Sequence, residues 1–331
     1  MLNAALSALH SDLPDTVPEH VAATLQRPLT AITLGSRWEG RIVWAVFAER
    51  SRTPTAVLKL DTRPKYQPRL RKEHEALHQL AQIPDMADLA PAPLGLYSLG
   101  SALMLAQTAQ AGVPLHVQLS RRYWRRRQSA TRDHARLRSW LAALRTGTTG
   151  ATTPVDPEAV QQRLAIALDR DSPGAAALQD RMAELGDEFG HLHVPTQPLH
   201  GDLDPSNCFT GRRGLSVVDW EGFTLQGPPL AEVLLFLNHY ARAVPTRDAW
   251  VPDPLVGFRN GFLADGWLAR LTWGTWRAEL EQLGLPAEAA EYLLVATLAD
   301  FATGHASTAH AHRKGSQRNW TELLTLYAAE R

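Results

Sequence analysis

The sequence has little of what marks a secreted, membrane-embedded or strongly nucleic-acid-binding protein. It contains one cysteine, Cys208, which excludes a disulfide framework or a thiolate metal site within one chain and favours a reducing, cytoplasmic setting. Its 34 basic and 34 acidic residues give a formal charge of zero, which argues against a bulk electrostatic grip on nucleic acid or membrane. No run reaches the roughly 18 apolar residues that cross a bilayer, and the first residues lack the pattern of a signal peptide.

Two common catalytic signatures are also missing. The absence of GxxxxGK[ST] excludes a P-loop, and the absence of HExxH removes the most familiar zinc-hydrolase motif. His191, His193 and His200 lie close to Asp202 in the sequence, but their spacing matches no zinc signature. We therefore interpret these histidines as solvated or hydrogen-bonded side chains.

The length of 331 residues and the order of the patterns predict two lobes. We expect a β-rich lobe over residues 1–105 and a helical lobe over residues 106–331. Alternation and β-branched content predict antiparallel strands at 41–49 and 55–60, a helix at 69–82, and two short strands within 94–107; helical patterns follow at 116–144, 158–192 and from 229 onward. The segment 145–157, rich in Gly, Thr and Pro, is predicted to be a mobile connector.

Three oxygen-bearing side chains stand among apolar residues in "LHGDLDPSNCF" and "LSVVDWEG". Pro205 forbids a regular helix between Asp202 and Asn207, so a loop that curls back would bring both to one point. Asp219 follows a short apolar strand. Because Mg²⁺ prefers oxygen ligands and takes few from protein, Asn207 and Asp219 suit it, which leaves Asp202 as a proton acceptor. The alternative is that Asp204 or Ser206 caps a turn and Asp202 accepts backbone N–H groups.

Lys59 and Glu73 are both placed where a charge is costly. Lys59 lies in the middle of an apolar strand, and Glu73 lies on the apolar stripe of the next helix, whereas Glu75 points to the polar face. Each supplies the charge that the other needs. Such a pair holds the α- and β-phosphates of ATP in kinases, although a structural ion pair or a snorkelling lysine would also fit.

Together these motifs resemble the aminoglycoside phosphotransferase and choline kinase family, whose members are small-molecule kinases. "HGDLDPSN" matches the family's HGDxxxxN motif, and "VVDWEG" matches its metal-binding segment. "AVLK" is similar to the strand lysine, "RKEHEALHQL" to the helix with its glutamate, "APAP" to the bend after that helix, and "ALMLAQTAQAGVPL" to the hinge. The resemblance covers about residues 29–237.

The resemblance implies an α+β, bilobal protein-kinase-like fold with a small β-rich N-lobe and a larger, mainly helical C-lobe. It implies an ATP- and Mg²⁺-dependent transfer of the γ-phosphate to a hydroxyl of a small molecule. The implied roles are proton acceptance by Asp202; loop shaping by His200 and Gly201; Mg²⁺ binding by Asn207 and Asp219; phosphate positioning by Lys59 and Glu73; and adenine contacts near Leu105 to Gln107.

Two departures from the family pattern leave a second hypothesis open. The segment that would cover the phosphates, Leu34–Arg41, is not glycine-rich, although Gly35 and Ser36 could offer backbone N–H groups. Glu232 stands where the family commonly has an aspartate that supports the catalytic loop. A catalytically weak, nucleotide-binding regulatory or scaffold protein with the same fold is therefore the alternative.

The sequence leaves the acceptor open. A sugar or other polyol, an amino alcohol and an antibiotic are all compatible, and a likeness of residues 219–237 to relatives encoded near surface-polysaccharide genes favours a sugar. The basic run 120–128 has three interpretations: a nucleic-acid contact, a solvated helix face with its aromatics packed inward, or a contact with an anionic acceptor. We favour the solvated face. The C-terminal tryptophans are interpreted as mostly helical core.

Overall fold

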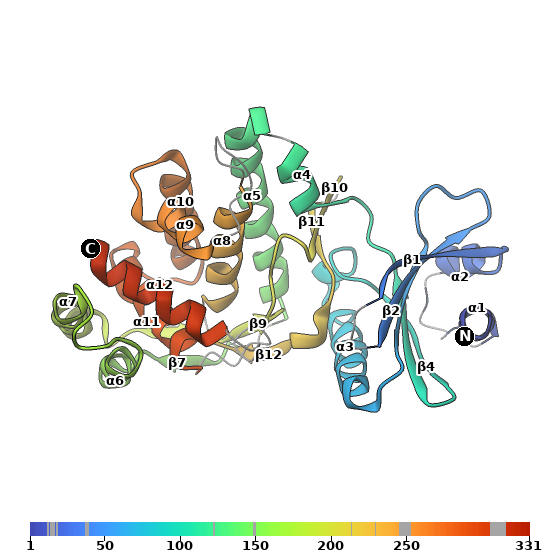
Figure 1. The fold of residues 1–331 in the computed structure, drawn as a ribbon, viewed down its shortest axis with the longest axis horizontal. Helices are drawn as coiled ribbons and strands as arrows, with labels where there is room; N and C mark the ends of the chain where they lie inside the picture. The colour runs from blue at the N-terminus through green and yellow to red at the C-terminus, as the bar shows by residue number, and fades with distance from the viewer. Residues whose placement is uncertain are drawn as a thin grey trace. The chain divides into compact units, whose positions relative to one another are not determined.

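The chain divides into two compact units (Figure 1). The computed structural model describes residues 1–11, 13, 17, 19–36, 40–121, 123–147, 150–212, 214–228, 230–244, 253–304 and 316–331. Unit 1 holds Met1–Gly112 and Phe209–Phe223, and unit 2 holds Val113–Cys208 and Thr224–Arg331. The chain therefore returns to unit 1 directly after Cys208, one residue beyond Asn207, and this segment contains Asp219.

Unit 1 is built on a five-stranded antiparallel sheet. Its strands are β1 (Leu29–Ser36), β2 (Arg41–Ala48), β3 (Ala56–Asp61), β4 (Pro93–Leu99) and β5 (Ala102–Thr108), in the order β1-β2-β3-β5-β4. The two strands predicted at 41–49 and 55–60 are β2 and β3, and they pair antiparallel as expected. The two strands predicted within 94–107 are β4 and β5, whereas β1 was not predicted.

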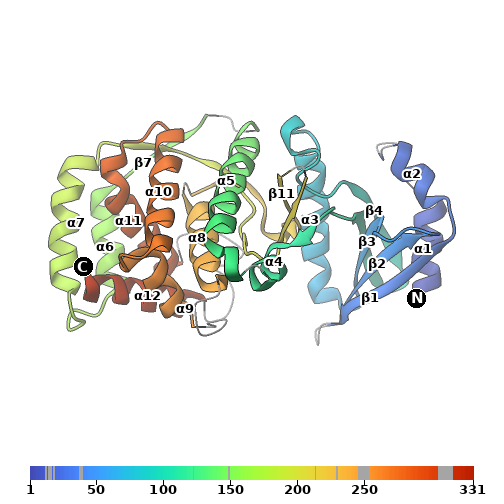
Figure 2. The same cartoon turned by 90° about the horizontal axis from the view of Figure 1, so that it is seen from above.

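The two faces of this sheet are covered by different helices. In Figures 1 and 2, α1 (Leu2–Ser11) and α2 (Glu19–Leu25) lie on one face and α3 (Gln67–Leu80) lies on the other. Alternate residues of β3 sort accordingly, because side chains along a strand point to opposite faces. Ala56, Leu58 and Leu60 join the apolar core with α1 and α2. Lys59 and Asp61 therefore belong to the α3 face.

The helix α3 follows the pattern read from the sequence. Pro68 lies in the first turn, where backbone N–H groups have no acceptor within the helix, so the N–H that proline lacks costs no hydrogen bond. Leu70, Leu77 and Leu80 are buried together with Glu73, and Glu75 is exposed, as the stripe predicted. The helix thus places one carboxylate, Glu73, in an apolar environment on the Lys59 face of the sheet.

The second segment of unit 1 carries Asp219 to the same region. It contains β10 (Cys208–Gly211), β11 (Gly214–Val217) and the short 3₁₀ turn η4 (Trp220–Gly222). The N–H of Val217 donates to the carbonyl of Leu89 over 2.9 Å, which joins the end of β11 to the loop after α3. The turn η4 packs against α3. Asp219 is fixed between these two attachments.

Unit 2 is mainly helical. Its helices are α4 (Leu115–Arg121), α5 (Arg126–Arg145), α6 (Pro157–Ala167), α7 (Ala175–Phe189), α8 (Ala231–Ala243), α9 (Pro254–Phe258), α10 (Trp267–Gln282), α11 (Ala290–Thr303) and α12 (Ser316–Glu330), with short turns η3 (Tyr123–Arg125), η5 (Arg259–Leu263) and η6 (Ala287–Ala289). Two small antiparallel pairs accompany them, β7 (Thr152–Pro154) with β8 (His193–Pro195) and β9 (Gln197–Leu199) with β12 (Thr224–Gly227). A β-rich unit and a helical unit confirm the α+β class.

The prediction of a mobile connector at 145–157 is wrong for its second half. Thr152–Pro154 pairs with β8, and Asp156 caps α6 by accepting the N–H groups of Glu158 and Ala159. The partner strand lies some forty positions further along the chain, so local composition could not reveal the pairing. Thr148 and Thr149 lie outside the described residues.

Large aromatic side chains form much of the core of unit 2, as predicted for most of the C-terminal tryptophans. Trp276 and Trp320 are fully buried, and the Trp320 ring stacks on Phe301 with centroids 4.4 Å apart. Trp267 and Trp273 are half-buried, and Trp250 lies outside the described residues. Within the described part of the chain, every helix is too short or too polar to cross a membrane.

Candidate active site

In unit 1 a single lysine is shared by two carboxylates. Lys59 Nζ lies 2.5 Å from Glu73 Oε1 and 2.9 Å from Asp219 Oδ1. Lys59 and Glu73 are buried, whereas the Asp219 side chain keeps 19 % of its surface exposed. The ion pair predicted between β3 and α3 is therefore present, and the structure adds Asp219 as a second partner of the lysine.

The electrostatics of this trio favour a charged lysine. Burial alone would lower the pKa of the Lys59 ammonium, but the adjacent Asp219 and Glu73 carboxylates raise it above its ordinary value. Burial raises the pKa of Glu73, and Lys59 opposes that shift. Glu73 Oε2 has no hydrogen-bond partner. One ammonium thus faces two carboxylates, which leaves the trio one positive charge short of neutrality when all three groups are ionised.

Asp219 occupies an uncommon backbone conformation. Its φ of 74° lies in the left-handed region, where aspartate is tolerated better than most residues with a side chain. The turn is held directly after it, because the Trp220 indole N–H donates to the carbonyl of Val217 over 2.9 Å and the whole Trp220 ring is buried. This conformation at the end of β11 turns the carboxylate toward Lys59.

A second ionic network in unit 1 lies on the same face of the sheet. Arg41, the first residue of β2, binds Asp61 through Nε and Nη2, with a shortest distance of 3.0 Å. Its Nη1 donates to Glu221 Oε2 over 3.1 Å, and Arg69 approaches Glu221 Oε1 at 4.0 Å. Arg41 thus links the start of β2 to the turn that follows Asp219.

In unit 2 the loop after β9 curls back on itself, as Pro205 suggested. The Asn207 amide Nδ2 donates to the backbone carbonyl of Asp202 over 2.9 Å and to its Oδ2 over 3.3 Å. Asp204 caps the turn by accepting the N–H of Ser206 over 2.7 Å. The turn-capping alternative is therefore correct for Asp204, and the loop brings Asp202 and Asn207 together.

A buried carboxylate of α8 binds the backbone of this loop. Glu232 Oε2 accepts the N–H of Gly201 over 2.9 Å, while Oε1 has no partner. Gly201 has a φ of 81°, a conformation that suits glycine. His200 is fully buried, and its Nδ1 accepts the N–H of Asp202 over 3.2 Å, which requires that nitrogen to be unprotonated. Glu232 and His200 therefore position the backbone on either side of Asp202.

Replacement of Glu232 by Gln is expected to change how stability depends on pH. Burial raises the pKa of Glu232 from 4.5 to about 7, against the opposing N–H groups of Gly201 and His200. The carboxyl of Glu232 therefore ionises at a lower pH in the unfolded chain than in the folded protein. As a result, the free energy of unfolding falls by roughly 3 kcal/mol as the pH rises from 4.5 to 7. Glu232→Gln should remove that loss.

Urea unfolding at pH 4.5, 6 and 8 measures this effect. Glu188→Gln, at an exposed position of α7, is the matched control and should keep the pH dependence of the unaltered protein. A Glu232→Gln protein whose stability follows the same pH curve as the unaltered protein would show that the pKa of Glu232 is the same in the folded and unfolded states.

The residues predicted to contact the nucleotide lie in strands of unit 1. Gly35 and Ser36 are the last residues of β1 and pair with Val43 and Ile42, and residues 37–39 of the predicted phosphate-covering segment lie outside the described residues. Leu105 is directly opposite Lys59, so both point to the same face. Because β5 has neighbours on both sides, the backbone of Leu105 and Gln107 belongs to the sheet. Their nucleotide contacts remain predictions.

The basic run differs from the favoured interpretation. Trp124 is 93 % exposed, so the prediction that the aromatics of this run pack inward is wrong for Trp124. The 3₁₀ turn η3 separates α4 from α5 and takes Trp124 out of phase with the buried face of either helix. Arg121, Arg125 and Arg127 are also exposed, and Arg122 lies outside the described residues.

The sequence of the matched region settles the family. The profile of the phosphotransferase enzyme family matches residues 30–278, which is most of the chain. The chain belongs to this family. The protein is therefore a phosphotransferase by descent, as the resemblance of its motifs implied. The match includes β3, α3, the loop at Asp202 and the turn at Asp219.

Other comparisons give less about this phosphotransferase. No curated protein matches it. Among solved structures, it is similar to the amicoumacin kinase hAmiN in complex with AMP-PNP, Ca²⁺ and Ami, with 11 % identity and a TM-score of 0.48; the alignment covers 98 % of this chain and 92 % of that one.

The predicted site residues fall into two groups, one in each unit. Lys59, Glu73 and Asp219 come together in unit 1, and Asp202 and Asn207 come together in unit 2. Among the residues that the structure describes, no group of three His, Cys, Asp or Glu side chains forms a metal cluster. Sequence reasoning missed the link from Arg41 to Asp61 and Glu221. The signal was available in part, because Asp61 lies two residues after Lys59 and shares its face.

Proposed function

We propose that the protein transfers the γ-phosphate of a nucleoside triphosphate, with Mg²⁺, to a hydroxyl group of a small molecule, with Asp202 as the proton acceptor. The observations that carry this proposal are the ion pairs of Lys59 with two carboxylates and the hydrogen bonds from Asn207 to Asp202. A buried ammonium held by two carboxylates suits phosphate binding, and a carboxylate positioned by an amide suits proton transfer. Both occur within the matched family region.

The nucleotide side of the proposal rests on Lys59. Glu73 holds the Lys59 ammonium from the side of α3, so that the lysine is fixed rather than free to rotate. A fixed cation neutralises the phosphates without reorganisation during transfer, which is the main contribution a protein makes to this reaction. Leu105, opposite Lys59, is proposed to form part of the adjoining nucleotide surface.

The acceptor side of the proposal rests on the loop at Asp202. Asn207 Nδ2 binds the Asp202 carboxylate and backbone, which fixes the direction of the remaining carboxylate surface. Asp202 would accept the proton of the acceptor hydroxyl as the hydroxyl oxygen attacks the γ-phosphorus. His200 and Glu232 would act by holding the backbone of this loop on either side of Asp202.

The donor set fits a hard divalent cation. The Asn207 amide uses its nitrogen toward Asp202, which directs its Oδ1 away from that contact, and Asp219 offers a partly exposed carboxylate. Both are oxygen donors, and the trio of Lys59, Glu73 and Asp219 lacks one positive charge. When bound, Mg²⁺ would neutralise charge on the phosphates. Asn207 and Asp219 are the residues that would hold it.

The test is an assay of nucleotide consumption with candidate acceptors. The purified protein, Mg²⁺ and ATP or GTP are incubated with sugars, amino alcohols and hydroxyl-bearing antibiotics, and phosphorylated product is detected by mass spectrometry. Product with at least one acceptor supports the proposal. Absence of product with every acceptor, together with ordinary Mg-nucleotide binding, would favour the alternative of a nucleotide-binding regulatory or scaffold protein.

Asp219→Ala is expected to abolish the Mg²⁺-dependent part of nucleotide binding. Loss of the carboxylate removes a proposed metal ligand and one of the two anionic partners of Lys59. Because Lys59 itself is kept, nucleotide without Mg²⁺ should still bind. The measurement is the shift of the melting temperature with AMP-PNP in the presence and absence of Mg²⁺. Asp180→Ala, at an exposed position of α7, is the control. A shift that depends on Mg²⁺ equally in both variants contradicts the ligand role.

A further inference from the structure

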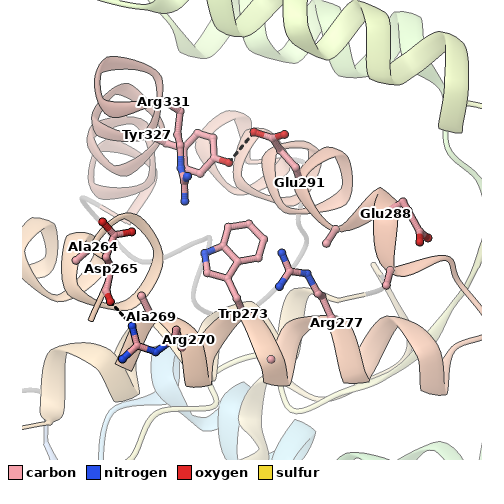
Figure 3. A pocket seen from close by; sticks show the side chains of 13 residues that line it. Ala264, Asp265, Ala269, Arg270, Trp273, Arg277, Glu288, Glu291, Tyr327 and Arg331 are labelled. Atoms are coloured by element: carbon pink, nitrogen blue, oxygen red, sulfur yellow. Dashed lines mark hydrogen bonds between the residues drawn. The ribbon is translucent and has the colours of Figure 1, made fainter. Parts of the chain in front are cut away.

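A cavity lies in unit 2, and none of the predicted site residues lines it. It has a volume of about 720 Å³ and is lined by α10, by η6 with the start of α11, and by the end of α12 (Figure 3). Trp273 stands in the middle of this cavity, and Arg270, Arg277 and Arg331 lie around it. We call it the Trp273 pocket.

The three arginines of the Trp273 pocket bind backbone carbonyls and an aromatic ring rather than carboxylates, among the residues that the structure describes. Arg270 donates to the backbone carbonyl of Asp265, and Arg331 Nη2 donates to the carbonyl of Phe262 over 3.0 Å. Arg277 rests over the Trp273 ring at 5.4 Å. Within the described residues none of the three forms an ion pair with a carboxylate. Most of the N–H donors of these three guanidinium groups therefore have no carboxylate partner within the described residues.

The acidic residues of the pocket are placed differently. Glu291 is already occupied, because Oε1 accepts the Tyr327 hydroxyl over 3.1 Å and Oε2 lies 3.7 Å from Arg181. Asp265 and Glu288 are exposed, and Figure 3 shows Glu288 at one end of the pocket, turned away from Trp273. The carboxylates of the lining therefore equal the arginines in number, but Glu291 is already paired and Glu288 is turned away from Trp273.

Trp273 adds a fixed flat surface to these charges. Its indole N–H donates to the carbonyl of Phe262 over 2.9 Å, which holds the ring in place. The next residue, Gly274, has nothing within 4 Å of the position that a Cβ would occupy, so the backbone beside the ring borders open space. A rigid indole flanked by guanidinium groups suits a flat ring that carries negative charge.

We propose that the Trp273 pocket is a second ligand site, for a small molecule that joins a phosphate or carboxylate group to a flat ring. The arginines would bind the anionic group through charge-assisted hydrogen bonds, and the ring would stack on Trp273. This site is separate from the proposed phosphotransfer residues, so its occupation does not require them.

Calorimetric titration of the full chain with phenyl phosphate tests the proposal. Phenyl phosphate should bind with a Kd below about 1 mM. Inorganic phosphate and phenol, which each carry one half of the recognised chemistry, should bind at least fivefold more weakly. Absence of saturable binding would overturn the proposal.

Charge variants give the sign of the interaction. Arg277→Gln, at an exposed position, should weaken phenyl phosphate binding about tenfold by removing a charge-assisted donor, and Asp265→Asn should strengthen it by removing a nearby negative charge. Arg318→Gln, an exposed arginine outside the pocket, is the matched control and should leave the affinity unchanged. Equal affinity in Arg277→Gln and Arg318→Gln would refute the assignment even if phenyl phosphate binds.

Discussion

Replacement of Asp202 by Asn is expected to lower the rate of phosphoryl transfer by about 10²- to 10⁴-fold and to leave Mg-nucleotide affinity nearly unchanged. Asn keeps an oxygen that can accept the Asn207 amide, so the loop geometry is preserved while the proton-accepting carboxylate is lost. The measurement is kcat with the acceptor found in the screen, alongside the Kd of AMP-PNP with Mg²⁺.

The control for this variant is Asp180→Asn, the same substitution at an exposed position of α7. It should keep full turnover. An Asp202→Asn protein with turnover equal to that control would mean that Asp202 does not accept the proton. Loss of turnover and of nucleotide binding together would instead indicate that the substitution disturbs the loop as a whole.

The largest expected loss of stability comes from Arg41→Met. Arg41 is the bidentate partner of Asp61, whose side chain is almost fully buried. Removal of one partner of a buried ion pair leaves an uncompensated charge, which typically costs about 3–5 kcal/mol. We expect this decrease in the free energy of unfolding, measured by urea titration followed by circular dichroism and by fluorescence.

A second substitution separates the charge from the packing. Arg41→Met combined with Asp61→Leu removes both charges, so most of the lost stability should return. Arg318→Met removes an exposed arginine that pairs with Glu322 and should change stability by less than about 0.5 kcal/mol. If the double variant is no more stable than Arg41→Met alone, then the unpaired Asp61 is not the cause of the loss.

The parts of the fold that sequence predicted are those whose signal is local. Alternation placed β2 and β3 correctly, and the spacing of Leu70, Leu77 and Leu80 placed α3 with Glu73 on its buried side. The pairing of Lys59 with Glu73 followed, because two costly charges on adjoining elements need each other. The helices α1 and α2 were missed although Ala5 and Leu9 show helical spacing, since short amphipathic segments give weak signals.

The parts that could not be predicted depend on contacts between distant positions. Arg41 meets Glu221 across 180 positions of the chain, and Lys59 meets Asp219 across 160. No periodicity or spacing contains such information. Glu232 is intermediate: the resemblance to the family marked it as a support for the loop, but only the structure gives its bond to Gly201.

The placement of α1 and α2 bears on how this family member should be trimmed. The family match begins at residue 30, after both helices, and ends at residue 278, before α11 and α12. Yet Leu9 and Leu25 cover Trp44, Leu58 and Met104 on the sheet. A fragment cut to the matched residues would bare that apolar face to solvent and invite self-association through it. The region that matches the family and the chain that covers this sheet are therefore different lengths of sequence.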